Sequence, residues 1–155
     1  MAQPPEPGGR GRLFFYSGGF LRERGLRRIL TLAGYDLRLG LPGPGDSVAV
    51  WGRSPTAARG EGIAARRGAG LIRVEDAFLR GLHPGDRGEP PAGLLIDPLG
   101  VHFDSAAPSR LERILASDPL DETSLLQRAR DGMARMATLG LSKYNNADPA
   151  LPLPE

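Results

Sequence analysis

The stretch VAVWGRSPTAARGEGIAARRGAGLIRVED, residues 48–76, determines the fold that the sequence predicts. Its apolar run 48–51 predicts a strand, and the residues GRSP that follow predict a turn. A helix is expected from Thr56, a suitable N-cap, to Gly68, a suitable C-terminal cap. The run 71–74 predicts a second strand, and two carboxylates end it. Strand, helix and strand in this order indicate a parallel unit with a right-handed crossover.

The same alternation precedes this unit. The run 13–16 predicts a strand, apolar residues at helical spacing between 26 and 33 predict a helix, and 35–39 predicts another strand. Strands that alternate with helices predict an α/β domain, here a Rossmann-like, mainly parallel sheet with helices on both faces. Ligands of such sheets bind beyond the carboxyl ends of the strands. The segments in which to search for a site are therefore 17–19, 52–56 and 75–80.

The pattern changes in the C-terminal half. Two short apolar runs, 94–96 and 101–103, flank the turn residues DPLG and predict a β-hairpin insertion. Ser109 and Glu112 have the spacing of a capping box and predict a helix. A last helix is expected to open at Asp118-Pro119, because proline suits the first helical position. Its predicted buried stripe comprises Leu125, Leu126, Ala129, Met133 and Met136.

Length and composition indicate one ordinary globular domain. The 155 residues are 40% hydrophobic and 25% charged, with a net charge of +2. We expect a disordered leader at 1–12, the α/β lobe at 13–145 and a linker at 146–155 that leads to a second lobe. No apolar run is long enough to span a membrane and the leader is unlike a signal peptide, so a cytoplasmic location is expected. The absence of cysteine excludes disulfides, thiolate metal sites and a cysteine nucleophile.

Several local motifs have simpler interpretations than a binding function. The glycines within 60–62 do not follow a strand, as a dinucleotide-binding motif requires. His83 and His102 have no visible ligand partners, so no metal site is predicted. The arginine pairs at 27–28 and 66–67 are interpreted as solvated helix faces. Few aromatic residues accompany the arginines, and nucleic-acid binding is not expected.

The segment RVEDAFLR, residues 73–80, allows two interpretations. Glu75 and Asp76 could supply an acid–base group whose ionisation is set by the flanking arginines. Alternatively, Asp76 caps the next turn and Glu75 forms an ordinary ion pair with one of those arginines. Trp51 and the glycine and arginine after it are similarly ambiguous, since they suit either the core or an anion-binding turn. Spacing alone leaves both questions open.

Eight pieces of the sequence are informative when they are taken together. They are YSG at 16–18, VWGRSP at 50–55, RVEDAFLR at 73–80, PP at 90–91, ID at 96–97, GVHFD at 100–104, PS at 108–109 and LSKYN at 141–145. In this order, from residue 16 to residue 145, they resemble the capsular polysaccharide biosynthesis family whose members transfer β-linked Kdo, an acidic sugar.

Four departures from the family pattern bear on substrate contacts and leave the expected fold unchanged. Ala77 stands where the family usually has glycine, and Gly81 where it usually has serine. Phe103 replaces a usual tyrosine, and the residues at 83–85 alter the loop after the acidic segment.

The resemblance implies a two-lobed, GT-B-like glycosyltransferase that needs neither metal nor cofactor. Such an enzyme adds β-linked Kdo from CMP-Kdo to a glycolipid acceptor during capsular polysaccharide biosynthesis. This chain would be its N-terminal lobe, inactive alone, because the second lobe holds most of the nucleotide. Glu75 and Asp76 are implied as catalytic residues. The implied substrate-binding residues are Ser17, Gly18, Gly52, Arg53, Arg80, Lys143 and Asn145; arginine forks suit the carboxylate of Kdo.

Two alternatives are compatible with the same sequence. The lobe could belong to a transferase for another acidic sugar, or it could be a non-catalytic α/β binding or assembly module of the capsule machinery. The implied partners are the second lobe and capsule assembly proteins at the inner membrane, where the protein would be cytoplasmic or peripheral.

Overall fold

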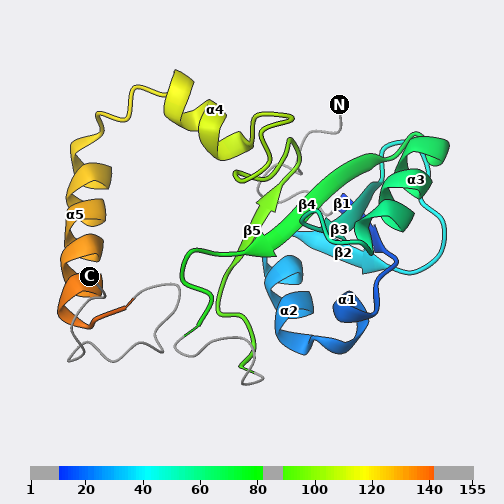
Figure 1. The fold of residues 1–155 in the computed structure, drawn as a ribbon, viewed down its shortest axis with the longest axis horizontal. Helices are drawn as coiled ribbons and strands as arrows, with labels where there is room; N and C mark the ends of the chain where they lie inside the picture. Colours follow the sequence, from blue (N-terminus) through cyan, green and yellow to red (C-terminus); the bar gives the residue numbers. More distant parts are fainter. Residues whose placement is uncertain (1–10, 82–88, 142–155) are drawn as a thin grey trace, which may run out of the picture.

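The computed structural model describes residues 11–81 and 89–141 (Figure 1). Within these residues, five strands form one sheet in the order β2-β1-β3-β4-β5. The strands are β1 (Gly11–Phe15), β2 (Tyr35–Arg38), β3 (Ser47–Trp51), β4 (Gly70–Asp76) and β5 (Leu94–Asp97). The helices are α1 (Gly18–Arg22), α2 (Arg24–Leu32), α3 (Ala57–Arg67), α4 (Arg110–Ser117) and α5 (Thr123–Thr138). None of these helices combines the length and the apolar character needed to cross a membrane.

The sheet is mainly parallel, as predicted. β1 pairs in parallel with both β2 and β3, and β3 pairs in parallel with β4. β5 runs antiparallel to β4, with Leu94 opposite Asp76. The carboxyl ends of β1, β3 and β4 therefore lie at one edge of the sheet, the edge at which ligands of such folds bind.

The predicted hairpin at 94–103 is wrong. β5 forms its antiparallel pair with β4, and the described residues contain no strand at 101–103. The buried carboxylate of Asp97 accepts hydrogen bonds from the backbone N–H groups of Leu99 and Gly100, at 2.8 and 3.2 Å. These bonds turn the chain away from the sheet. Val101 is then buried, and its carbonyl accepts a hydrogen bond from the N–H of Asp104 at 2.9 Å. Two consecutive turns leave no extended segment that could pair with β5.

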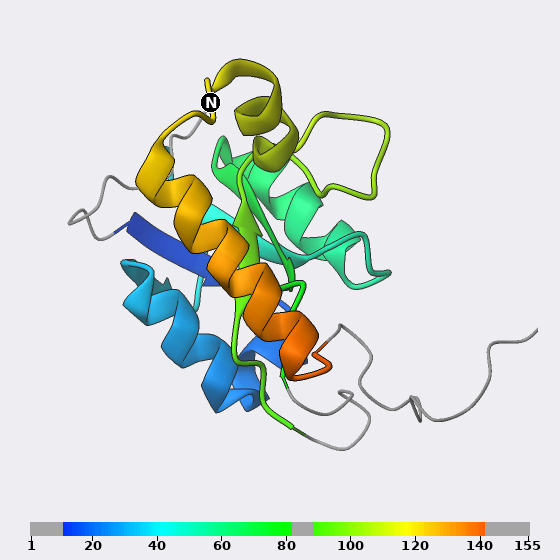
Figure 2. The same cartoon turned by 90° about the vertical axis from the view of Figure 1, so that its left-hand side faces the viewer.

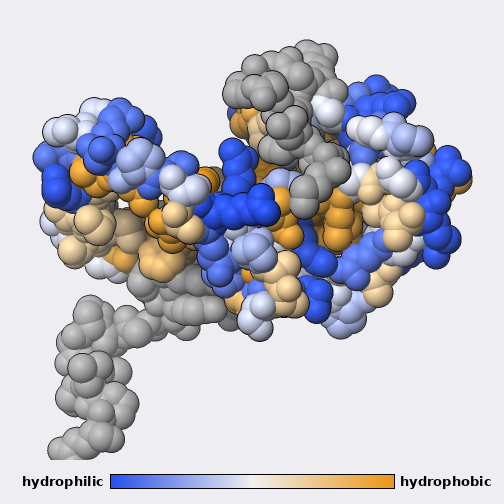
Figure 3. Space-filling model, turned by 90° about the horizontal axis from the view of Figure 1, so that it is seen from above, coloured by the Kyte–Doolittle hydropathy of each residue, from blue (hydrophilic) through white to orange (hydrophobic). Residues whose placement is uncertain are grey.

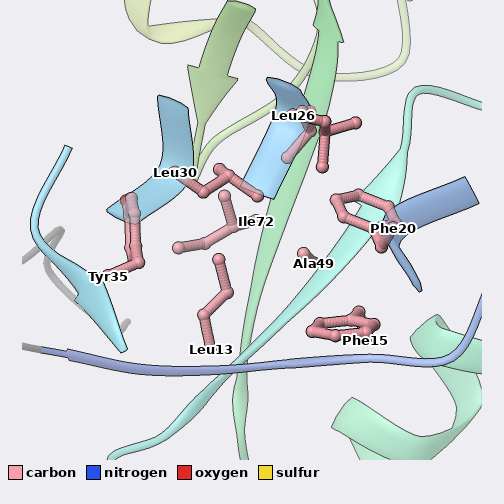
Figure 4. Close-up of a cluster of buried hydrophobic side chains, with 9 residues drawn as sticks. Leu13, Phe15, Phe20, Leu26, Leu30, Tyr35, Ala49 and Ile72 are labelled. Atoms are coloured by element: carbon pink, nitrogen blue, oxygen red, sulfur yellow. The ribbon is translucent and has the colours of Figure 1, made fainter. Parts of the chain in front are cut away.

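The helices α1 and α2 cover one face of the sheet. Figure 4 shows Leu26 and Leu30 of α2 pointing toward Leu13 and Ile72 of the strands. The leucines lie four residues apart and thus on one face of their helix, which explains why this face is buried. The full cluster comprises Leu13, Phe15, Phe20, Leu26, Leu30, Tyr35, Ala49, Ile72 and Val74.

The helix α3 covers the other face, which confirms helices on both sides of the sheet. Its buried positions are all small: Ala57, Gly60 and Ala64. A Cβ atom at Gly60 would lie 2.6 Å from Cγ1 of Val50, so glycine allows α3 to lie close against β3. Gly68 ends the helix in the left-handed conformation, with φ of 62°, as its predicted capping role requires.

The helix α4 begins at the predicted capping box. The Ser109 hydroxyl accepts a hydrogen bond from the N–H of Glu112 at 3.2 Å, and the Glu112 carboxylate accepts one from the N–H of Ser109 at 2.7 Å. The predicted opening of the last helix at Asp118-Pro119 is wrong, because α5 begins at Thr123. Asp118 instead ends α4 in an extended conformation, and its N–H donates to the carbonyl of Ile114.

The apolar stripe predicted for α5 exists, but the prediction that it is buried is wrong. No residue of α5 is buried, and Leu125 and Met133 are 51% and 62% exposed. In Figures 1 and 2, α4 and α5 form an arm at the side of the sheet. Figure 3 shows apolar residues at the surface of this arm, on the left of the view. The error has a simple cause: helical periodicity identifies an apolar face and not the element that covers it.

Candidate functional site

A pocket lies at the carboxyl ends of β1 and β3. Its volume is about 340 Å³, and it combines aromatic and aliphatic surface with a few polar groups. This composition is typical of small-molecule sites, in which a mostly apolar wall carries a small number of orienting polar atoms. The lining residues are Ser17, Gly18, Gly19, Phe20, Glu23, Leu26, Trp51, Ser54, Thr56, Arg80 and Pro91.

Local structure explains why the first of these residues reach the pocket. β1 ends at Phe15, and Ser17 has an extended backbone before α1, with no capping hydrogen bond from its hydroxyl group. Phe20 in α1 is 1% exposed and anchors this turn against the core. Its ring stacks on Phe15, with centroids 5.8 Å apart, and meets Trp51 at the end of β3 edge-on at 6.4 Å. The turn at 17–19 is therefore fixed beside the end of β3.

The end of β4 places Glu75 against Gly52. A Cβ atom at Gly52 would collide with Oε2 of Glu75 and would lie 3.5 Å from Cζ of Phe103. Gly52 also has a φ of 41°, in the left-handed region that other residues avoid. The other oxygen of Glu75, Oε1, accepts a hydrogen bond from the N–H of Asp76 at 3.0 Å. Gly52 thus provides both the turn and the space in which this carboxylate lies.

The ion pairs in this region differ from the simple interpretation of the sequence. Arg73 pairs with Glu61 at 2.8 Å, and Arg80 pairs with Asp76 at 2.7 Å. In the described part of the chain, Glu75 forms no ion pair, so the alternative in which it pairs with a flanking arginine is wrong. Asp76 is held by Arg80 through an ion pair rather than by a capping interaction.

Two arginines near this turn, Arg73 and Arg53, have different surroundings. Arg73 donates from Nη1 to the carbonyl oxygen of Gly52 at 2.6 Å, and its guanidinium is largely buried. Arg53 contacts Asp104 at 3.3 Å, and its side chain is 52% exposed. Arg73 therefore acts as a structural support, whereas Arg53 retains an exposed cationic surface.

The structure brings together most, but not all, of the site residues predicted from the sequence. Ser17, Gly18 and Arg80 line the pocket. Glu75, Gly52 and Arg53 form a cluster beside it with Phe103 and Asp104, and Asp76 joins the two through Arg80. Lys143 and Asn145 lie outside the described residues, as does His83.

Sequence reasoning missed several residues that line the pocket. Glu23 supplies a carboxylate from the junction of α1 and α2, and Pro91 comes from a distant loop. Thr56 was expected to cap α3, but it makes no capping bond, and its hydroxyl lies 2.8 Å from that of Ser54. The polar sequence Ser54-Pro55-Thr56 after a strand end was a usable signal for the two hydroxyl groups. Pro91 belongs to the Pro-Pro piece of the family resemblance, which did not assign it to a site, and no local signal pointed to Glu23.

Tyr16 directly follows β1, and its surroundings change the pKa of its hydroxyl group. Burial raises the pKa of the Tyr16 hydroxyl, and the positive charges of Arg59 and Arg67 oppose part of that rise. The phenol is therefore protonated at neutral pH and donates a hydrogen bond to the carbonyl of Gly40 at 2.8 Å. Its role is to fix the loop after β2.

The residues 11–81 and 89–141 contain no group of three His, Cys, Asp or Glu side chains that could hold a metal ion. His102 is exposed, and its ring meets that of Phe103 edge-on at 5.4 Å. Among the described residues, the polar groups of the site are therefore hydroxyls, carboxylates and guanidinium groups.

Comparison with known proteins gives the family. Residues 46–148, more than half of the chain, match the family described as capsule polysaccharide biosynthesis protein. The chain belongs to this family. The capsule polysaccharide modification protein LipA of Neisseria meningitidis serogroup A is 36% identical over 132 residues. The lipopolysaccharide-processing protein LpsZ of Rhizobium meliloti is 41% identical over 76 residues, which are 48% of this chain and 17% of LpsZ.

Two solved structures of Kdo transferases have a similar fold. The β-Kdo 2,4 transferase of Thermosulfurimonas dismutans KpsC matches with a TM-score of 0.79 and 28% identity. The β-Kdo 2,7 transferase of the same protein has a TM-score of 0.60 and 20% identity, and so supports the fold alone. This member of the capsule polysaccharide biosynthesis family therefore has a glycosyltransferase-like fold.

This chain matches only part of the length of each relative. The match covers 83% of this chain but 19% of LipA. It covers 90% of this chain but 43% of the KpsC β-Kdo 2,4 transferase structure. The chain thus corresponds to a part of these larger proteins.

Proposed function

We propose that this chain is one lobe of a glycosyltransferase that transfers β-linked Kdo from CMP-Kdo to a glycolipid acceptor during capsule polysaccharide biosynthesis. The observation that carries the proposal is the TM-score of 0.79 to the β-Kdo 2,4 transferase, over 90% of the chain. The match spans 43% of that structure, which supports the existence of a second lobe. We propose that this lobe completes the site and holds the nucleotide. The pocket at the strand ends supports the same assignment, since this is where ligands bind in parallel sheets.

The pocket has groups that suit a sugar. The hydroxyls of Ser17, Ser54 and Thr56 can exchange hydrogen bonds with sugar hydroxyls, while Trp51 offers an apolar surface. Gly18 exposes backbone at the same edge. This combination of an apolar wall and a few hydroxyl groups fits a small polar ligand.

Arg53 is the better candidate for binding the carboxylate of Kdo or a phosphate. Its side chain is half exposed, and its contact with Asp104, at 3.3 Å, is longer than an ideal charged hydrogen bond. Arg80 is held by Asp76 at 2.7 Å, and we assign this pair to positioning the pocket wall. Lys143 and Asn145 are proposed as further substrate contacts on the family resemblance alone.

Glu75 is proposed to hold the acceptor or to transfer a proton. Its carboxylate has no ion-pair partner in the described residues, one oxygen faces Gly52, and it lies at a strand end beside the pocket. A carboxylate with a free oxygen can act as a general base once the substrate is bound. Asp76 contributes in two ways. Its backbone N–H donates a hydrogen bond to Glu75, and its carboxylate holds Arg80 in an ion pair.

The location and partners follow from the proposed acceptor. A glycolipid acceptor lies in a membrane, so the protein is proposed to work at the cytoplasmic face of the inner membrane, with capsule assembly proteins nearby. Nucleic acid is not a proposed partner.

The donor is tested with the two-lobed protein, purified and incubated with a synthetic glycolipid acceptor. We expect mass spectrometry to detect addition of one Kdo from CMP-Kdo and none of N-acetylneuraminic acid from its CMP donor. Transfer of the second sugar in place of Kdo would assign the lobe to another acidic sugar. No transfer from either donor would favour a binding module.

Residues 1–155 alone are expected to show no transfer in the same assay. A two-lobed site holds donor and acceptor on facing surfaces, and loss of that arrangement removes the rate gained from proximity and orientation. Turnover of CMP-Kdo by this chain alone would contradict the proposal that a second lobe is required.

A further inference from the structure

The outer face of α2 carries three arginines that no carboxylate in the described residues neutralises. Arg24, Arg27 and Arg28 are all exposed, and none belongs to the ion pairs that the described residues form. They line a shallow depression of about 460 Å³ together with part of β2. The carboxylate in that depression, Asp36, already pairs with Arg38 at 2.7 Å. We call these three residues the α2 arginines.

This positive charge is a local concentration. The segment 21–38 contains five arginines and two carboxylates, a net charge of +3, whereas the whole chain has a net charge of +2. The remainder of the chain is therefore slightly negative. An anionic partner would be attracted to this face in preference to the rest of the molecule.

Leucines border the charged face. Leu32 is 77% exposed and lies four residues after Arg28, on the same side of the helix. Leu21, in α1, is 49% exposed. On the opposite side of α2, Leu26 and Leu30 are buried in the core, which holds the helix rigidly against the sheet (Figure 4). The outer face is thus a fixed cationic surface with apolar side chains at both ends.

We propose that the outer face of α2 docks on the surface of an anionic lipid bilayer. Arginine forks pair with lipid phosphates in two-point contacts, and exposed leucines beside cationic residues can enter the boundary between headgroups and acyl chains. A bilayer matches a convex helix face with charges spread over more than one turn. Nucleic acid is the less suitable partner, because no aromatic residue is exposed among the α2 arginines for stacking on bases.

This orientation has a consequence for the pocket. Leu26 of α2 lines the pocket from the inner side of the helix, and Glu23 lines it from the residue before the helix. A bilayer on the outer face of α2 would therefore lie one helix away from the pocket. The docking proposal goes beyond the transferase assignment, and its test requires no enzymatic activity.

The test is vesicle co-sedimentation of the 155-residue chain. Vesicles of phosphatidylglycerol and phosphatidylcholine in equal amounts are compared with vesicles of phosphatidylcholine alone. The chain is expected to bind the first and not the second, and added salt should weaken the binding. The variant R27Q/R28Q should lower the partition coefficient roughly thirty-fold, through the loss of two cationic charges at an anionic surface.

The matched control is R66Q/R67Q, which removes an adjacent arginine pair from α3 on the other face of the sheet. It changes the net charge equally, and its partition should change by no more than about two-fold, because the sheet separates those charges from the docked bilayer and salt screens them. Circular dichroism verifies that both variants fold. A second pair, Leu32→Ser against Leu115→Ser on α4, tests the apolar contact, and the first alone should weaken binding.

Four results would overturn the proposal. The first is equal binding to both vesicle types or to neither. The second is equal loss in the two arginine variants, which would indicate net charge alone. The third is displacement by inorganic phosphate but not by chloride at equal ionic strength, which would indicate a compact anion site. The fourth is binding of a DNA duplex in preference to anionic vesicles, which would indicate a nucleic-acid surface.

Discussion

Gly52 shows how a single residue sets the geometry of the candidate site. The sequence predicted a turn at this position, because a glycine follows an apolar strand. It could not predict that Glu75 lies against the glycine, since this contact depends on the pairing of β3 with β4. Closeness in sequence likewise did not predict the ion pairs. Arg73 is two residues from Glu75 but forms its ion pair with Glu61 on α3.

The substitution Gly52→Ala should destabilise the chain by about 1–3 kcal/mol, because a left-handed φ is costly for alanine. The added Cβ would also displace the Glu75 carboxylate. Urea unfolding followed by circular dichroism measures the change. Gly19→Ala in α1 is the control, since a Cβ there meets nothing within 4 Å. Equal stability of the two variants would show that Gly52 is not constrained.

At the scale of elements, two glycines in one helix have different roles. Helix propensity treats Gly60 and Gly62 alike, as residues that weaken α3. In the structure, Gly60 lies against Val50 of the sheet, whereas a Cβ at Gly62 would meet only the flexible end of Arg66, at 3.3 Å. Helix propensity alone cannot distinguish them, because the difference arises from the packing of α3 on β3.

Gly60→Ala and Gly62→Ala should therefore change stability in opposite directions. Alanine at 62 should stabilise the chain by about 0.5–1 kcal/mol through helix propensity. Alanine at 60 should destabilise it by about 1–3 kcal/mol, because an extra methyl group in a tightly packed contact forces the helix away from the sheet. Thermal unfolding of both proteins gives the two values. A gain in stability at both positions would contradict the close packing of α3.

The helices and strands that were predicted correctly are marked by residue patterns within their own sequence. The parallel strands are short apolar runs between turns, and α4 begins at a capping box in which both partners are three residues apart. The failed hairpin also involves a contact that is distant in sequence. Besides its two local hydrogen bonds, Asp97 accepts a third, from the N–H of Arg110 at 2.7 Å, and so joins the end of β5 to the start of α4.

At the scale of the whole molecule, the sheet and the arm differ in how they are stabilised. Leu13, Val48 and Val74 are fully buried in the sheet, whereas α5 has no buried residue. The sequence predicted correctly at which edge of the sheet the pocket lies. The carboxyl ends of parallel strands share one edge, whatever the sequences of the loops that follow them. It could not predict Pro91 or Glu23 in the pocket, because these residues arrive from a distant loop and a helix junction.

Hydrogen exchange should separate the two parts in the 155-residue chain. Helices whose side chains are exposed open locally at little cost, whereas core strands exchange only on global unfolding. Amides of α5 are therefore expected to exchange much faster than those of β3, as measured by mass spectrometry of peptides from each element. Amides of α5 as protected as those of β3 would contradict the exposed position of this helix.

Paired measurements on Glu75→Gln test whether the carboxylate of Glu75 belongs to a catalytic site. Initial rate of Kdo transfer and melting temperature are measured on the same preparations of the two-lobed protein, with Glu61→Gln as the control for a carboxylate in an ion pair. We predict that Glu75→Gln keeps its melting temperature and loses activity by on the order of 100-fold or more. Glu61→Gln should melt at a lower temperature with a near-normal rate. A normal rate for Glu75→Gln would show that this carboxylate has no catalytic role.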